Sequence, residues 1–238
     1  MRLDKYIQQK FNLKSRTYAE NLILTERVEV VGKIVKKPSF DVDESAEVKI
    51  LNDENFASQG AYKLEEAFEC FSLVAENRYC LDVGCSNGGF SDVLLRHGAN
   101  KIIALDVAGC ALPSELLNSG KIEFLRANAR EMPLANDTFD MVVSDVSFIS
   151  LTYILAEVFR VLKVGGEAVV LVKPQFELDK SALDKNGIVK TEKLRLKALE
   201  QVSEFAKSVG FVIAGTGTAP IRYQNKNVEY LLYLKKPL

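Results

Sequence analysis

The sequence predicts an α/β protein in which a doubly wound parallel sheet follows a small N-terminal α+β domain. From Tyr79 onward, short apolar segments alternate with segments of helical periodicity, which is typical of a parallel sheet covered by helices. The first fifty residues have a different order, with two helical segments before the strands. A chain of 238 residues has room for one large and one small domain. We expect domains at residues 1–58 and 59–238.

The N-terminal domain is predicted from four short segments. RLDKYIQQKF has its apolar residues on one helical face, and SRTYAENLI begins with Ser15, a residue type that caps helices. RVEVVGKIV alternates around Gly32, which indicates a tight turn, and AEVKIL is typical of a closing strand. The result is a compact helix-helix-strand unit.

The elements of the large domain follow in strict alternation. The predicted strands are YCLDVG, KIIALDV, IEFL, FDMVVSDVSF and EAVVLVK, and then FVIAGTGTA and NVEYLLYLK close the chain. The predicted helices are GGFSDVLLRHG, PSELLNSG, LTYILAEVFRVLK and TEKLRLKALEQVSEFAKSVG. We expect the third of these helices to end at Gly165 and Gly166, since glycine is common directly after a helix.

Composition excludes several classes of protein. No apolar run approaches the roughly 20 residues that span a bilayer, and the N-terminus lacks the apolar core of a signal peptide. The four cysteines form no CxxC pair and there is one histidine, which argues against a zinc site. We therefore expect a reduced, cytoplasmic protein that binds no metal. The oligomeric state is not predicted.

The net charge of −1 hides an asymmetry along the chain. Residues 1–37 carry nine Lys and Arg against four Asp and Glu, a balance of +5, so the remainder carries −6. A basic end on a nearly neutral chain indicates an anionic partner, although a solvated face explains the same count equally well.

The segment LDVGCSNGGFSD connects the first strand of the large domain to its first helix. Glycines at this point let a ligand approach the backbone, and a helix N-terminus offers free N–H groups. The pattern is not GxGxxG, so a dinucleotide fits poorly. Asp106 ends the next strand, where an acid accepts ribose hydroxyls. Asp82, Asp106 and Asp145 all fall at carboxyl ends of strands, where open α/β sheets bind ligands.

This arrangement of acids and glycines resembles the S-adenosylmethionine site of Rossmann-like methyltransferases, a fold that also ends in an antiparallel strand. The cofactor carries a sulfonium and an amino group, so an acid beside the glycines is electrostatically favourable. A plain tight turn is the alternative explanation of the glycines. The residues expected at the cofactor are Asp82, Gly84, Ser86, Gly88, Gly89, Phe90, Asp106, Asn128 and Asp145.

EAVVLVKPQFE contains a buried strand that ends on Lys173. Pro174 cannot supply the next ladder N–H, so the chain turns away and the lysine faces the ligand crevice. Spacing alone leaves two other residues open. Lys63 could be a solvated lysine paired with a nearby glutamate, and Glu229 could face outward from an edge strand.

Several segments together resemble known families. RLDKYI, SRTYAENLI and RVEVVGKIV are similar to the S4-type (alpha-L) RNA-binding module. SQGAYKLEEAF, LDVGCSNGGFSD, SDVSFISL, LVKPQFE, GIVK and NVEYLLYL resemble the TlyA family, also called hemolysin A, which are ribosomal RNA 2′-O-ribose methyltransferases related to the FtsJ group. The resemblance implies S-adenosylmethionine as cofactor, ribosomal RNA as partner, and a catalytic set of Lys63, Asp145, Lys173 and Glu229.

The resemblance also implies a role for each residue of that set. Lys173 would be the base or final proton acceptor, Asp145 would orient it, Lys63 would position the hydroxyl or its phosphate, and Glu229 would complete the network. We expect burial and Lys63 to lower the pKa of Lys173, and the two acids to oppose this. The expected RNA phosphate contacts are Arg2, Lys5, Lys14, Arg16 and Arg27.

Enzymes of this family act on cytidine ribose in large-subunit RNA, and a longer form also acts on small-subunit RNA. Since the S4-type module begins at Met1, we expect 23S rather than 16S rRNA as substrate. The alternatives are a membrane-lytic hemolysin, a non-catalytic ribosome-assembly protein that binds RNA, and a base methyltransferase. The missing span and signal argue against the first, and SDVSF is not the N/DPPY motif usual in the last.

Overall fold

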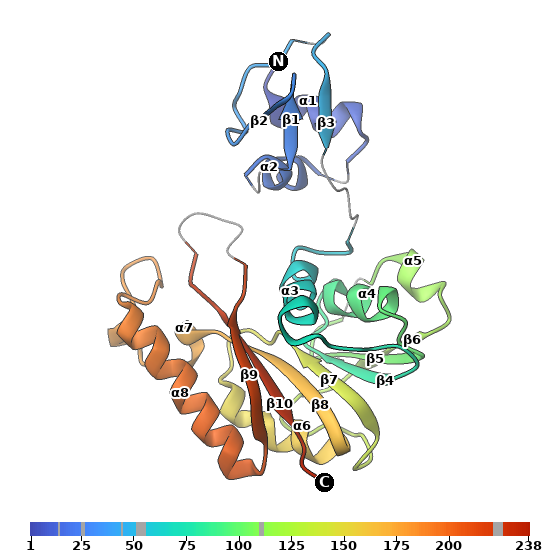
Figure 1. The fold of residues 1–238 in the computed structure, drawn as a ribbon, viewed down its shortest axis with the longest axis vertical. Coiled ribbons are helices and arrows are strands. Elements are labelled where there is room, and N and C mark those ends of the chain that lie inside the picture. Colours follow the sequence, from blue (N-terminus) through green and yellow to red (C-terminus); the bar gives the residue numbers. More distant parts are fainter. Residues whose placement is uncertain (14, 25–26, 44, 51–55, 110–111, 221–225) are drawn as a thin grey trace. The chain divides into compact units, whose positions relative to one another are not determined.

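The computed structural model describes residues 1–13, 15–24, 27–43, 45–50, 56–109, 112–220 and 226–238 (Figure 1). The chain forms two compact units, and the second begins at Phe56.

The first unit has two helices and a small antiparallel sheet, as predicted. Ser15 Oγ accepts a hydrogen bond from Tyr18 N at 3.1 Å, which is the expected helix cap. Val31 and Gly32 have φ values of 48° and 74° and form the expected tight turn. The sheet has the strand order β2-β1-β3. The elements are α1 (Leu3–Lys10), α2 (Arg16–Leu24), β1 (Val28–Val30), β2 (Lys33–Ile34) and β3 (Val48–Ile50).

The second unit is built on a seven-stranded sheet, which confirms the predicted α/β class. Its strands are β4 (Tyr79–Val83), β5 (Lys101–Asp106), β6 (Ile122–Arg126), β7 (Phe139–Ser144), β8 (Leu162–Val172), β9 (Val212–Thr218) and β10 (Tyr230–Lys235). They lie in the order β6-β5-β4-β7-β8-β10-β9. Strands β4 to β8 pair in parallel, and β10 pairs antiparallel with both β8 and β9.

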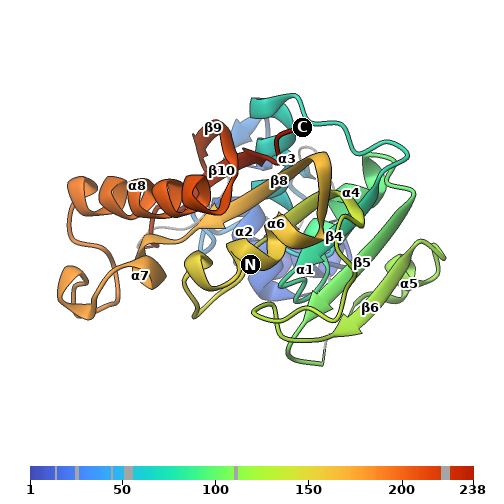
Figure 2. The same cartoon turned by 90° about the horizontal axis from the view of Figure 1, so that it is seen from below.

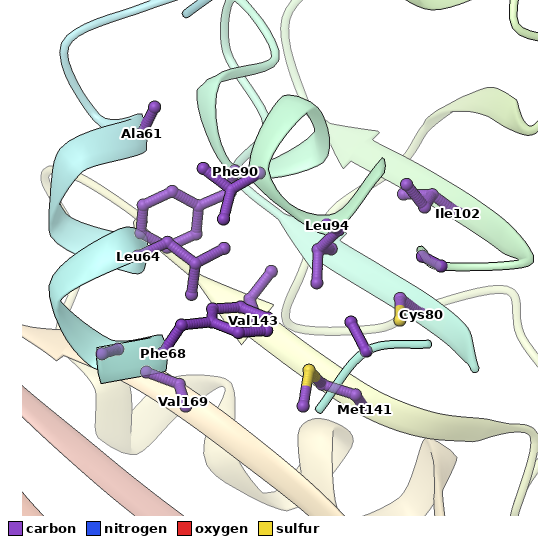
Figure 3. Close-up of a cluster of buried hydrophobic side chains, with 14 of the residues drawn as sticks. Ala61, Leu64, Phe68, Cys80, Phe90, Leu94, Ile102, Met141, Val143 and Val169 are labelled. Carbon is purple, nitrogen blue, oxygen red and sulfur yellow. The ribbon is translucent and has the colours of Figure 1, made fainter. Parts of the chain in front are cut away.

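Helices lie on both faces of this sheet (Figures 1 and 2), and apolar side chains form a core on each face. One core includes Leu64, Phe68, Phe90 and Val143, which Figure 3 shows between two helices and the sheet. The other core packs α6 (Leu155–Val161) and α8 (Glu192–Val209) against the opposite face. The helices of the unit are α3 (Ala61–Phe71), α4 (Gly89–Arg96), α5 (Ser114–Leu117), the 3₁₀ helix η1 (Leu151–Tyr153), α6 (Leu155–Val161), α7 (Pro174–Glu177), the 3₁₀ helix η2 (Lys180–Ala182) and α8 (Glu192–Val209).

The expected end of one helix at Gly165 and Gly166 is wrong. Helix α6 ends at Val161, and Leu162 already pairs with Phe139 in the sheet. The two glycines lie inside β8, where the register against β7 shifts. A Cβ on Gly166 would lie 2.8 Å from the carbonyl oxygen of Lys163, so glycine is needed for an irregular strand rather than for a helix cap.

The sheet topology determines where functional side chains meet. The carboxyl ends of the parallel strands β4, β5, β7 and β8 share one edge of the sheet. Because β10 runs antiparallel to β8, its first residues lie at that same edge. Ligands of open α/β sheets bind at this edge.

Candidate active site

Four ionisable side chains that are far apart in the sequence meet at the carboxyl edge of the sheet. Asp145 directly follows β7 and Lys173 directly follows β8. Tyr230 pairs with Val172, so Glu229, the residue before β10, lies beside the end of β8. Lys63 comes from the first turn of α3. The structure thus brings together all four residues of the expected catalytic set.

Asp145 is the centre of this network. Its Oδ1 lies 2.6 Å from Lys173 Nζ, and its Oδ2 lies 3.2 Å from Lys63 Nζ. Lys63 Nζ also lies 2.7 Å from Oε2 of Glu229. The Lys173 side chain is only 7% exposed, against 24% for that of Lys63. One carboxylate therefore holds two ammonium groups, and a second carboxylate contacts only Lys63.

The network shifts the pKa values of its members. Burial would lower the pKa of Lys63, but the charges of Asp145 and Glu229 outweigh burial and raise the pKa above its ordinary 10.5. Burial would raise the pKa of Asp145, but Lys173 and Lys63 outweigh burial and lower it. Lys63 is therefore a cation at neutral pH and cannot act as a base. A fixed cation suits the positioning role that we expected of it.

Ser147 is a neighbour of Lys173 that the sequence did not single out. Lys173 Nζ donates a hydrogen bond to Ser147 Oγ at 2.8 Å, and lies 3.4 Å from the backbone carbonyl oxygen of Asp145. The ammonium group thus has three partners on the loop after β7. The available signal was the motif SDVSF, in which Asp145 and Ser147 are separated by one residue.

Glu177 holds this loop in place from the other side. Its carboxylate accepts hydrogen bonds from Ser150 Oγ at 2.5 Å and from Leu151 N at 2.9 Å. Burial raises the pKa of Glu177, and these two hydrogen bonds oppose the rise. Because Glu177 ends the short helix α7 that follows Lys173, it ties the two halves of the site together.

Phe148, the next residue in the loop, is held in an unusual conformation. Its φ is 66°, a value rare for bulky residues and costing about 1–3 kcal/mol. Its side chain is nevertheless 90% exposed, with its ring centroid 5.2 Å from that of Phe176. The strained backbone thus holds an aromatic ring exposed in the loop that carries Asp145 and Ser147.

The expected cofactor end contains two acids in different environments. Asp82 is completely buried, its Oδ2 accepts a hydrogen bond from Ser91 Oγ at 2.7 Å, and burial raises its pKa to about 7. Within the described part of the chain, Asp82 Oδ1 is buried without a hydrogen-bond partner. Asp106 is half-buried and accepts hydrogen bonds from Ser86 N and Ala108 N, both at 3.0 Å.

The other residues expected at the cofactor have contacts within the chain. Gly84 and Gly88 adopt φ values of 82° and 80°, which favour glycine. A Cβ on Gly89 would lie 2.2 Å from Ser58 Oγ, so this glycine is needed for packing at the start of α4. Phe90 lies in the core (Figure 3), and Asn128 Oδ1 accepts a hydrogen bond from Arg130 N. The tight-turn explanation thus accounts for Gly84 and Gly88, packing accounts for Gly89, and the cofactor contacts stay predictions.

In the first unit, two of the expected RNA contacts bind an internal acid. Asp4 is completely buried and lies 2.8 Å from Arg2 Nη2 and 2.7 Å from Arg16 Nη2. Burial would raise the pKa of Asp4, but the two guanidinium groups hold it well below its usual range. Lys5 is exposed, Arg27 is half-buried, and Lys14 lies outside the described residues. Arg2 and Arg16 therefore stabilise the unit as well as presenting charge.

Within the described ranges, no helix is both long and apolar enough to cross a membrane. Those ranges also hold no group of three or more His, Cys, Asp or Glu side chains placed to hold a metal ion. Cys70, Cys80 and Cys85 are free thiols.

The fold and the site together define a methyltransferase with an attached S4-type domain. Residues 56–236 match the family described as FtsJ-like methyltransferase, and residues 1–48 match the S4 domain. The chain belongs to the FtsJ-like methyltransferase family, as its sequence motifs indicated.

Curated relatives extend over almost the whole chain. Hemolysin A of Brachyspira hyodysenteriae is 35% identical and covers 98% of this chain and 99% of its own length. The 16S/23S rRNA (cytidine-2′-O)-methyltransferase TlyA of Mycobacterium tuberculosis is 35% identical over 98% of this chain and 89% of its own. The 23S rRNA (cytidine-2′-O)-methyltransferase TlyA of Campylobacter jejuni is 33% identical, over 99% and 100%. A solved putative hemolysin from Streptococcus thermophilus has a TM-score of 0.74 at 32% identity, and covers 100% of this chain and 88% of that one.

Proposed function

We propose that this protein transfers a methyl group from S-adenosylmethionine to the ribose 2′-oxygen of a cytidine in 23S rRNA. The observation that carries the proposal is the network in which Asp145 holds Lys63 and Lys173 at the ligand-binding edge of the sheet. The two relatives named as TlyA both methylate cytidine 2′-O, and 23S is common to both names. The S4 domain supports an RNA substrate, and a ribosomal substrate in turn supports a cytoplasmic location.

The network explains how a weakly acidic hydroxyl can react. Bound S-adenosylmethionine supplies an electrophilic methyl group, and the 2′-oxygen must lose its proton as the new C–O bond forms. Lys173, in its neutral form, accepts that proton, and Asp145 orients the amine and stabilises the ammonium that results. Lys63 stays positively charged and holds the hydroxyl or its phosphate, while Glu229 keeps Lys63 in position.

The residues at the expected cofactor end fit S-adenosylmethionine. The partnerless Oδ1 of Asp82 is a buried acidic oxygen beside the glycine turn, as a cationic ligand requires. Asp106 ends β5, where an acid binds ribose hydroxyls, and its oxygens keep lone pairs beyond the two backbone contacts. The N-terminus of α4 adds free N–H groups.

The test is to incubate purified protein with methyl-labelled S-adenosylmethionine and ribosomal subunits that lack the modification. We expect label in large-subunit RNA, located by mass mapping at a cytidine ribose, and no label with the Lys173→Ala variant. Label only in 16S rRNA would contradict the choice of subunit. Binding of subunits without any methyl transfer would support a non-catalytic assembly protein, and leakage of liposomes would support a lytic one.

A further inference from the structure

A hollow of about 450 Å³ lies next to the reactive network but does not include it. Its size is within the range of ligand pockets. The loop after β7, the helix η1, the short helix α7 and the long helix α8 contribute its walls, and none of the four network residues lines it. Its walls include three aromatic rings, two cations, an amide and two acids, from Phe148, Tyr153, Phe176, Arg130, Lys197, Gln201, Glu177 and Asp179.

The aromatic rings form two separate places where a flat group can stack. The first is the exposed ring of Phe148 beside Phe176, and Phe148 directly follows Ser147, whose Oγ accepts a hydrogen bond from Lys173. The second is Tyr153 on η1, which is 61% exposed and has the guanidinium of Arg130 4.7 Å from its ring centroid. One base can occupy only one of these places. The base of the reacting nucleotide suits the first, which leaves the second for another base.

The second stacking place also has groups that recognise a nucleotide. Lys197 and Gln201 are four residues apart on α8, so their side chains lie on the same face of that helix and both reach the hollow. A lysine or arginine binds a phosphate, an amide binds the edge of a base, and aromatic rings and guanidinium planes stack on unpaired bases. These four groups together match a single-stranded nucleotide.

We propose that Tyr153, Arg130, Lys197 and Gln201 bind the unstacked base of a nucleotide that neighbours the methylated one. This inference rests on the proposed function. The methylated ribose lies at Lys173, its base lies at Phe148, and the neighbouring base enters the hollow. The protein then recognises a second nucleotide of the RNA. This contact increases its sequence specificity beyond what the contacts of the S4 domain provide.

The test uses the RNA fragment that the wild-type protein methylates and a series in which single flanking nucleotides lack their base. For wild type, loss of one particular flanking base raises KM by roughly 5- to 150-fold, the range of one stacked base. With the intact fragment, the KM of the Tyr153→Ala variant is higher than that of wild type by a similar factor. Removal of that flanking base does not raise the KM of the variant further. Its affinity for S-adenosylmethionine and its kcat stay unchanged, because it removes only substrate binding.

Two matched variants on α8 sharpen the test. Lys197→Ala reduces the salt dependence of RNA binding, whereas Lys207→Ala, on the same helix but outside the hollow, does not. The inference is overturned if no flanking base affects KM, if only the base of the methylated nucleotide does, or if Tyr153→Ala stays as sensitive as wild type to the missing base. If wild type methylates no RNA at all, the proposed function fails first and this inference with it.

Discussion

Lys63 and Lys173 hold opposite oxygens of the same carboxylate, that of Asp145, at 3.2 and 2.6 Å. This geometry makes the three residues unequal. Without Asp145, two largely buried ammonium groups remain close together and only Lys63 keeps an acid, Glu229. If only one of the two lysines is removed, Asp145 still has the other as a cationic partner.

We therefore expect Asp145→Asn to destabilise the second unit more than Lys173→Met does. Removal of one partner from a buried ion pair costs about 3–5 kcal/mol, and the 18% exposure of Asp145 favours the lower end of that range. Urea unfolding measures the difference. An exposed pair, Lys101 with Glu123, supplies the control, since its loss costs less than about 1 kcal/mol. Equal stability of the Asp145→Asn variant and wild type would show that the network is not held by this charge.

The Lys173→Ala variant should lose methyl transfer and keep the cofactor. Loss of a positioned proton acceptor reduces kcat by about 10²–10⁴-fold. The hydrogen-bond and ion-pair partners of Lys173 are Asp145 and Ser147 rather than Asp82 or Asp106, so calorimetric affinity for S-adenosylmethionine should stay unchanged. Turnover at the wild-type rate would remove Lys173 from the mechanism. The Ser147→Ala variant loses only one hydrogen bond to the Lys173 amine. Its kcat should therefore lie between that of wild type and that of the Lys173→Ala variant.

Below about pH 10, activity should not decline through loss of the positive charge of Lys63. The pKa of Lys63 lies above its ordinary 10.5 in the folded protein, so its stabilising contribution is complete below that value and is lost only as the pH rises through the raised pKa. Glu229→Gln removes one of the carboxylates that raise this pKa. A pH–rate profile for that variant should therefore decline at lower pH than wild type. Coinciding profiles would contradict the assignment of Glu229.

The affinity for S-adenosylmethionine should rise as the pH rises through about 7. Asp82 titrates near that value, and a cationic ligand binds its ionised form, so binding below pH 7 requires loss of a proton. We expect about a tenfold gain between pH 6 and pH 8 by calorimetry, since one proton is released. The Asp82→Asn variant should bind S-adenosylmethionine more weakly and show no such gain with pH. This comparison separates the titration of Asp82 from any titration of the ligand itself.

Ser91 provides a second control for Asp82. Its hydroxyl donates a hydrogen bond to the carboxylate and lowers the pKa, so Ser91→Ala should move the midpoint to higher pH. The sign for stability is opposite to that for binding. Because the pKa is raised above 3.8, the contribution of Asp82 to stability is lost as the pH rises to about 7, and Asp82→Asn should be more stable than wild type at pH 8.

Substitutions in the basic N-terminal unit should separate into two groups. Arg16→Gln should destabilise the unit, because the buried carboxylate of Asp4 loses a partner, and Asp4→Asn should restore part of that stability. Lys5→Gln should leave thermal unfolding unchanged and reduce the salt slope of subunit binding by about 0.7–0.9. If Lys5→Gln binds ribosomal subunits with the wild-type salt slope, this lysine is no phosphate contact.

The sequence was sufficient for the sheet and for the position of the site. Continuous apolar segments such as the one before Lys173 form strands because burial on both faces requires them. Once the strands are known, Asp145 and Lys173 must meet at one edge. The pairing of Lys63 with Glu229 is different, since it depends on how α3 docks and on the insertion of β10 between β8 and β9. Only the family resemblance pointed to that pair.

Three features of the structure have physical causes that one sequence does not reveal. Glycine permits both a helix end and an irregular strand, so Gly165 gave no means of choosing between them. A count of charges treated Arg2 and Arg16 as free cations, although Asp4 in the first turn of α1 is buried and binds both. The role of Glu177 depends on the path of the loop after β7, because Ser150 in that loop donates a hydrogen bond to its carboxylate.

The insertion of β10 between β8 and β9 has a consequence for incomplete chains. Until residues 230–235 are in place, one edge of β8 lacks its partner, and the apolar residues 168–172 of that edge are free to pair with other chains. Glu229 directly precedes the same strand. Proteolysis or a premature stop before this point would therefore produce an aggregating polypeptide rather than a soluble, weakly active enzyme.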